Sequence, residues 1–279
     1  MKTYALGPMV LAAAFFIFTS AEVAAQGQSA SATAMLEEIV VTARRREESL
    51  QDLPLSVQAV TADAMQAQGV YNMIQIADYV PNLVLSEFSR MNDTRMFVRG
   101  IGGGFSNPAQ VFGVGMYVDG HYLSGSLGAF MSTADIERVE VLRGPQGTLF
   151  GKNTTGGAIS IITAKPGPEF DSYVTLRAGD YGMQDVRAMV NFPITDNLFV
   201  RLNYANESND GHWFNTWNNE HTGGKDQQSI GVALRWEIND NWTLDARLAS
   251  ADDRDSQIPA QCLSAPNQAV YDALSLIHI

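Results

Sequence analysis

From residue 171 onward, apolar and polar residues alternate with a period of two, which predicts β-strands that each present one apolar face. Five such strands are expected within residues 171–251. Their second face carries charged side chains, among them Asp185, Arg187 and Arg201. Arginine and aspartate are costly in a dry sandwich core but are well solvated in a wet lumen. The pattern therefore favours the first strands of an antiparallel transmembrane β-barrel over a soluble β-sandwich.

The connections between these strands support the same interpretation. Residues 179–183, 193–197 and 239–241 are short links, whereas residues 208–227 form a long one. Outer-membrane barrels have tight turns on the periplasmic side and longer loops outside, so we expect links 193–197 and 239–241 on the periplasmic side. Aromatic residues on the apolar face lie near these two turns, where a girdle would meet the lipid headgroups: Phe192, Trp236 and Trp242.

The preceding segment, residues 49–166, mixes short helices and strands and predicts an α+β domain. Thr61 caps a helix that Gly69 ends, and a second helix runs over residues 72–79 and stops before Pro81. Strands are expected at residues 56–60, 83–87, 95–98, 114–118, 121–123 and 158–163, and at residues 135–142 after a helical turn. Glycine-bearing loops are expected at residues 100–104 and 144–157.

The first 25 residues have the charged, apolar and small-residue segments of a secretory signal, with cleavage expected after Ala25. Its apolar segment is too short for a membrane helix, which needs about 20 apolar residues. Residues 26–48 form a linker that contains one β-branched segment, residues 37–43. Because this segment has no predicted neighbour to pair with, it is suited to adding itself to the sheet edge of another protein. The alternative is an ordinary first strand of the next domain.

Charge and composition narrow the function. The chain has 18 basic and 30 acidic residues, a net charge of -12, which argues against a nucleic-acid partner. Residues 147–153 approach a phosphate-binding loop, but the glycine spacing is one residue short and Asn153 stands where Ser or Thr is needed. We find no catalytic pattern and no metal-ligand cluster, and expect neither enzyme activity nor a cofactor. Four rings in the long link are expected to be ordinary surface residues: His212, Trp213, Trp217 and His221.

Several motifs resemble those of the TonB-dependent outer-membrane receptors. EEIVVTA at residues 37–43 resembles the TonB box, and LPLSVQAV at residues 53–60 resembles the start of the plug domain. FVRG at residues 97–100 and YVDG at residues 117–120 are similar to central plug motifs. The most specific stretch, residues 136–166, resembles the plug end of the iron-complex receptor branch. The resemblance covers nearly the whole mature chain.

This resemblance implies active uptake across the bacterial outer membrane, driven by TonB and its inner-membrane proton-driven complex. A ferric siderophore is the expected ligand. Cobalamin, haem or an oligosaccharide would use the same mechanism, and a passive porin is the alternative from another class. The other expected partner is outer-membrane lipid.

The resemblance also implies roles for particular residues. The box that pairs with TonB consists of Glu37, Glu38, Ile39, Val40, Val41, Thr42 and Ala43. Arg99 and Arg143, in the FVRG and LRGP motifs, are expected to lock the plug by pairing with barrel carboxylates. The plug residues expected to face the ligand are Asn92, Asp93, Thr94, Phe105, Ser106 and Asn107.

Residues 252–279 are expected to be a shortened extracellular loop, and the final LSLIHI looks like sequencing read-through. A plug of this size resembles those enclosed by barrels of about 22 strands. Five strands would leave two open edges, and unpaired backbone groups in lipid are costly. We therefore expect the remaining strands, and any disulfide partner of Cys262, in a longer protein.

Overall fold

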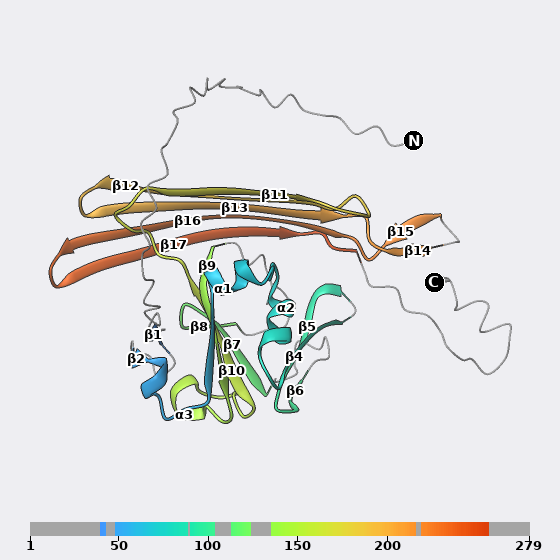
Figure 1. The fold of residues 1–279 in the computed structure, drawn as a ribbon. Helices are drawn as coiled ribbons and strands as arrows, with labels where there is room; N and C mark the ends of the chain where they lie inside the picture. The colour runs from blue at the N-terminus through green and yellow to red at the C-terminus, as the bar shows by residue number, and fades with distance from the viewer. Residues whose placement is uncertain are drawn as a thin grey trace, which may run out of the picture. The chain divides into compact units, whose positions relative to one another are not determined.

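The computed structural model describes residues 40–42, 48–88, 90–103, 113–123, 135–215 and 219–256, all within the compact unit Glu38–Ile279 (Figure 1). These residues form two five-stranded sheets, three smaller sheets and several short helices. The first elements along the chain are β1 (Val40–Val41), β2 (Glu48–Ser49) and the 3₁₀ helix η1 (Leu50–Asp52).

The α+β domain is built on a mixed sheet with the strand order β3-β9-β10-β7-β8. Its strands are β3 (Val57–Thr61), β7 (Val114–Val118), β8 (His121–Leu123), β9 (Ile136–Arg143) and β10 (Gly157–Thr163). β10 runs parallel to β7, and the other neighbours are antiparallel. Asp119 and Gly120, with φ of 47° and 80°, make the predicted tight turn between β7 and β8. β3 lies at one edge of the sheet, paired with β9.

Two capped helices follow β3. α1 (Ala62–Ala67) begins at Thr61, whose side chain accepts a hydrogen bond from a backbone N–H of the first turn. α2 (Met73–Ile76) begins at Asn72, in a capping box, and continues into the 3₁₀ helix η2 (Ala77–Tyr79). Three apolar side chains of the helices are buried in the domain core: Met65, Met73 and Ile76. Burying a side chain of this size contributes about 1.5–3 kcal/mol.

A three-stranded antiparallel sheet completes the domain. Its strands are β4 (Leu83–Phe88), β5 (Arg90–Val98) and β6 (Ile101–Gly103). β6 and the short helix α3 (Gly147–Phe150) lie where only loops were predicted. β6 pairs with β5 because Arg99 and Gly100, with φ of 53° and 76°, turn the chain back sharply. A strand of one isoleucine and two glycines has no periodicity that could reveal it.

The helical turn predicted at the start of the segment 135–142 is wrong. Asp135 has a φ of 69°, in the left-handed region, and β9 begins at the next residue. Aspartate tolerates this conformation better than most residues. Its carboxylate also makes contacts, described below, that hold it in place.

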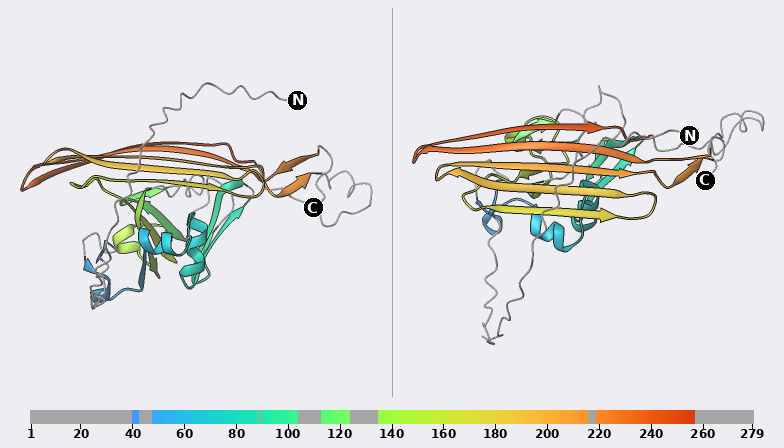
Figure 2. Two further views of the ribbon diagram at one scale, coloured as in Figure 1. Left: turned by 45° about the horizontal axis from the view of Figure 1, so that its top comes forward. Right: turned by 90° about the horizontal axis from the view of Figure 1, so that it is seen from above.

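The second five-stranded sheet, which we call the C-terminal sheet, is antiparallel throughout, with the order β11-β12-β13-β16-β17 (Figures 1 and 2). Its strands are β11 (Asp171–Ala178), β12 (Gln184–Thr195), β13 (Leu198–Asn209), β16 (Lys225–Asn239) and β17 (Trp242–Asp253). A small hairpin of β14 (Trp213–Asn215) and β15 (Glu220–Thr222) projects between β13 and β16 (Figure 1). Adjacent strands pair in the order in which they occur along the chain.

The C-terminal sheet exposes its apolar face and buries much of its polar face. Val174 and Leu248 are 69% and 79% exposed, whereas Asp185 and Asn203, on the opposite face, are 1% and 7% exposed. This is the reverse of a soluble sheet, which hides its apolar side. The predicted fold class, an α+β domain followed by the first strands of an antiparallel barrel, is confirmed in this open form. Among the described residues, no helix is both long enough and apolar enough to cross a membrane.

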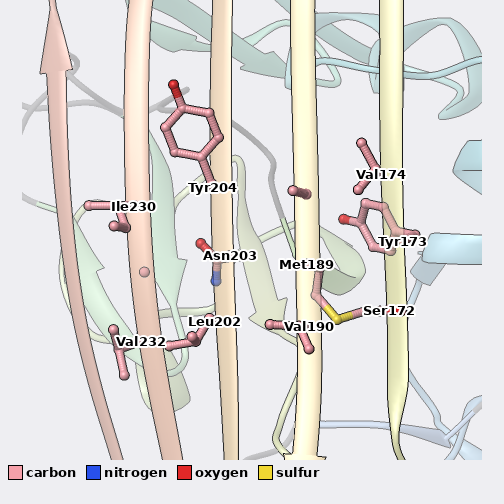
Figure 3. A pocket seen from close by; sticks show the side chains of 12 residues that line it. Ser172, Tyr173, Val174, Met189, Val190, Leu202, Asn203, Tyr204, Ile230 and Val232 are labelled. Carbon is pink, nitrogen blue, oxygen red and sulfur yellow. The ribbon is translucent and has the colours of Figure 1, made fainter. Parts of the chain in front are cut away.

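The C-terminal sheet carries a hollow of about 400 Å³ (Figure 3). Large aliphatic and aromatic side chains of β11, β12, β13 and β16 line it, including Val174, Val190, Leu202, Tyr204, Ile230 and Val232. Ala188, a small residue in the same lining, lies on the same face as Val174, Tyr204 and Ile230 and leaves space between these larger side chains.

Candidate functional site

The described part of the candidate box is docked on the α+β domain. β1 pairs antiparallel with β2, and Val41 is fully buried in a cluster with Tyr117, Leu142 and Ala158. The expectation that the box has no neighbour to pair with is therefore wrong, because β2 supplies a strand and the sheet supplies an apolar site for Val41. Residues 37–39 and Ala43 lie outside the described residues.

A buried carboxylate holds the end of this segment. The backbone N–H and the hydroxyl of Thr42 both donate to Oε1 of Glu140, at 2.8 and 3.2 Å. Arg138 donates to the same oxygen through Nε at 2.9 Å and also pairs with Glu137. Glu140 is fully buried on β9, and among the described residues its Oε2 has no hydrogen-bond donor. Charge-assisted hydrogen bonds of this kind are stronger than neutral ones.

The two arginines of the candidate plug lock both contact the start of β3. Arg99 is exposed and donates to Oγ of Ser56 at 3.3 Å. Arg143 is partly buried and donates through Nη2 to Oε1 of Gln58 at 2.5 Å, while its buried Nε meets no acceptor within the described part of the chain. That both pair with barrel carboxylates outside this chain stays a prediction.

The structure describes only part of the predicted ligand-facing set. Asn92, Asp93 and Thr94 belong to strand β5 rather than to a loop. Strand β5 is longer than predicted because its pairing with β4 continues past residue 95, with Thr94 opposite Glu87. Phe105, Ser106 and Asn107 lie outside the described residues. A role in ligand binding stays a prediction for all six.

One contact between the domain and the C-terminal sheet, which we call the Asp135 anchor, was missed from the sequence. Asp135, 5% exposed, accepts hydrogen bonds from Nε of Arg201 at 2.7 Å and from Nδ2 of Asn203 at 3.1 Å. Both donors lie on β13. Their positions on the polar face were visible in the sequence, but no pattern pointed to their shared partner, 66 residues before Arg201 and 68 before Asn203.

A second contact, which we call the Tyr71 clasp, joins the linker between α1 and α2 to β11 and β12. The guanidinium of Arg177 lies 3.6 Å from the centre of the Tyr71 ring, and Nη2 of Arg187 donates to the Tyr71 carbonyl at 3.0 Å. Asp185 orients both arginines, accepting from Nε of Arg177 at 2.8 Å and from Nε of Arg187 at 3.2 Å. A cation over an aromatic ring is attracted by its electron-rich face.

Aromatic rings gather around Tyr181, which lies in the link between β11 and β12 at the end of the C-terminal sheet opposite the β12–β13 and β16–β17 turns. The rings of His212 and His221 lie 6.2 and 6.1 Å from it, and His212 lies 3.8 Å from Trp213. Within the part of the chain that the structure describes, no three His, Cys, Asp or Glu side chains are grouped to hold a metal ion. Trp217 lies outside the described residues.

Comparison with known proteins gives these features a family. Residues 49–158 match the TonB-dependent Receptor Plug Domain. The pesticin receptor of Yersinia pestis is 29% identical over 213 residues, covering 74% of this chain and 31% of that receptor. The vitamin B12 transporter BtuB of Vibrio vulnificus (strain CMCP6) is 28% identical over 162 residues, covering 56% of this chain and 25% of the transporter.

A solved structure agrees. The ferric yersiniabactin uptake receptor FyuA of Yersinia pestis superposes with a TM-score of 0.67 at 26% identity, covering 73% of this chain and 32% of that chain. A plug domain followed by strands with an apolar outer face defines a plugged outer-membrane receptor. Residues 49–158 belong to the plug domain family of the TonB-dependent receptors, and the chain spans 25–32% of the length of these three relatives.

Family membership confirms two predictions made from the sequence, the receptor class and the location in the bacterial outer membrane. The relatives are receptors and transporters by name, not enzymes. From here on we call the α+β domain the plug.

Proposed function

We propose that the complete receptor takes up a scarce, bulky ligand across the outer membrane, with a ferric siderophore as the substrate class. The observation that carries this proposal is a plug domain fastened to the polar inner face of strands whose other face is apolar. An open diffusion channel would need no such plug, which argues against a passive porin. The named ligand of the solved relative is a ferric complex, which favours the siderophore class over cobalamin.

Energy for release of the plug comes, in this proposal, from TonB and its proton-driven inner-membrane complex. TonB pairs with residues 37–43 as an added strand, where main-chain hydrogen bonds provide affinity. In the structure, Val40 and Val41 pair with β2, the side chain of Val41 is buried in an apolar cluster, and Thr42 is hydrogen-bonded to Glu140. Pairing with TonB therefore requires these contacts to break first.

The test is growth of a strain with the complete gene deleted and then restored, under iron limitation with single ferric siderophores or haem supplied in turn, and separately in a vitamin B12 auxotroph with vitamin B12 as the limiting nutrient. Restoration by a ferric siderophore that also requires TonB supports the proposal. Restoration by vitamin B12 alone or haem alone would keep the mechanism and replace the substrate class. Uptake that is unaffected by loss of TonB would refute the energy-coupled mechanism.

A further inference from the structure

The apolar face of the C-terminal sheet ends at a row of polar side chains. On β16 this face is apolar from Ile238 to Ile230, eight residues along the strand, or about 27 Å at 3.4 Å per residue. Strands tilted by 35–45° give this length a height of about 20 Å, close to the apolar band of about 25 Å in outer-membrane barrels. The next residue on the same face is Gln228, which pairs with Asn206 and Asp252. This polar row therefore marks one boundary of the membrane.

The polar row lies at the outer leaflet. Tight turns of such barrels face the periplasm, and the β12–β13 and β16–β17 turns are at the other end of the sheet. Tyr204 lies just inside the row, and its hydroxyl accepts a hydrogen bond from Nε2 of Gln228 at 3.3 Å. Tyrosine is enriched at this depth because its ring is apolar and its hydroxyl is polar. The two residues mark the level of the outer-leaflet headgroups.

The hollow of the C-terminal sheet begins directly below this level. Ala188 forms its floor, between Val174 on β11 and Tyr204 on β13. Ile230 continues the row on β16, and Val190 bounds the hollow on the side away from the headgroups (Figure 3). A hydrocarbon chain over Ala188 would contact side chains on more than one side, whereas on an even surface it contacts only those beneath it. Each added contact contributes dispersion attraction.

The place of the hollow selects its occupant. The lining side chains of this face are almost all hydrocarbon, so they suit an apolar occupant without hydrogen-bonding groups: Val174, Ala188, Val190, Leu202, Ile230 and Val232. In the outer membrane this face meets lipid, whose acyl chains begin just below the headgroups. An acyl chain of the outer leaflet is therefore the apolar group available at the depth of Ala188.

We propose that the hollow is a binding site for one acyl chain of an outer-leaflet lipid, which it holds more tightly than the other lipids around the barrel are held. The chain enters from the headgroup side, past Tyr204, and lies over Ala188 towards Val190. The site depends on the location of the receptor in the outer membrane and not on which ligand the receptor takes up.

Photo-cross-linking of the purified complete receptor in vesicles tests the site. The vesicles consist of phosphatidylethanolamine and phosphatidylglycerol, with a small fraction of phosphatidylethanolamine that carries a diazirine near the carboxyl end of one acyl chain. Peptide mass spectrometry measures the labelling of Tyr204. Ala188→Leu fills the hollow without adding a polar group, so this labelling should fall several-fold.

Ala246→Leu is the matched control. Ala246 lies on the same face, opposite Leu234, and outside the hollow, so this variant should keep the labelling of Tyr204 within about twofold of normal. Equal labelling in the two variants would show only ordinary exchanging lipid at this face and would overturn the proposal. If Ala188→Leu does not fold, Ala188→Val makes the same comparison with a smaller side chain.

The position of the diazirine along the chain tests the leaflet. A chain from the outer leaflet brings its first carbon atoms close to Tyr204, so a diazirine near the carboxyl end should label Tyr204 more strongly than one at the terminal methyl. The reverse order would assign the chain to the inner leaflet and overturn the proposal.

Native mass spectrometry of the complete receptor extracted from outer membranes counts the bound lipid. Detergent washing that removes the exchanging lipids should leave about one lipid per receptor, and Ala188→Leu should lose it while Ala246→Leu keeps it. Equal retention in the two variants would overturn the proposal. So would a protein chain retained on this face in place of the lipid.

Discussion

At the scale of single residues, Glu140 is the side chain on which the docking of the box depends most directly. It accepts two hydrogen bonds from Thr42 and one from Arg138 without any exposure to solvent. Glutamine in its place keeps the shape but loses the charge. We therefore expect Glu140→Gln to weaken the docking by about 1.5–3 kcal/mol, the usual worth of a hydrogen bond to a charged group.

Thiol labelling of Val41→Cys in the complete receptor, with Cys262 replaced by serine, measures this effect. Labelling without ligand should accelerate about tenfold or more in the Glu140→Gln variant. Glu137→Gln is the matched control, since Glu137 also pairs with Arg138 but its side chain is 44% exposed. Equal labelling rates in the two variants would show that Glu140 does not hold the box.

At the scale of elements, the box itself can be tested by removing one backbone donor. Val40→Pro deletes an N–H that an added strand would use, and proline is tolerated poorly within a β-ladder. We expect uptake to fall to background while ligand binding stays within about twofold of normal, because residue 40 lies on the plug and not among the extracellular loops. Val40→Thr retains both the N–H and the branched shape and should transport normally. Transport by the proline variant would show that residues 37–43 are not the strand that binds TonB.

The elements that the sequence predicted well are those with local signals. Thr61 and Asn72 begin helices because their side chains accept backbone hydrogen bonds within the first turn, which depends on nearby residues only. Period-two alternation likewise located the strands of the C-terminal sheet. β6, by contrast, exists through pairing with β5, and the left-handed Asp135 depends on contacts to β13, so neither has a local signal.

The same distinction between local signals and long-range contacts applies to the candidate site. The motifs pointed to a candidate box and two candidate lock arginines, and these roles stay predictions. They did not reveal the burial of Val41 among residues of β7, β9 and β10, or the β9 carboxylate that holds Thr42 from nearly 100 residues away. Both arginines of the Tyr71 clasp were visible as polar-face residues. Their target, an aromatic ring between two short helices, was not, because it is defined only when the plug meets the sheet.

At the scale of the whole molecule, an arginine substitution should have different effects on the two faces of the C-terminal sheet. Leu248 lies on the exposed apolar face, 79% accessible, and pairs with Val232. Ala249, the next residue, points to the other face and pairs with Gly231. In the complete receptor, arginine at position 248 would enter lipid, at a cost of about 2–4 kcal/mol near the bilayer midplane. Arginine at position 249 would enter the interior, where charged side chains are already common.

We therefore expect Leu248→Arg to reduce the fraction of receptor folded in the outer membrane several-fold, as measured by heat-modifiable mobility on gels. Ala249→Arg should leave this fraction close to normal. The opposite ranking would mean that the apolar face of the sheet does not meet lipid.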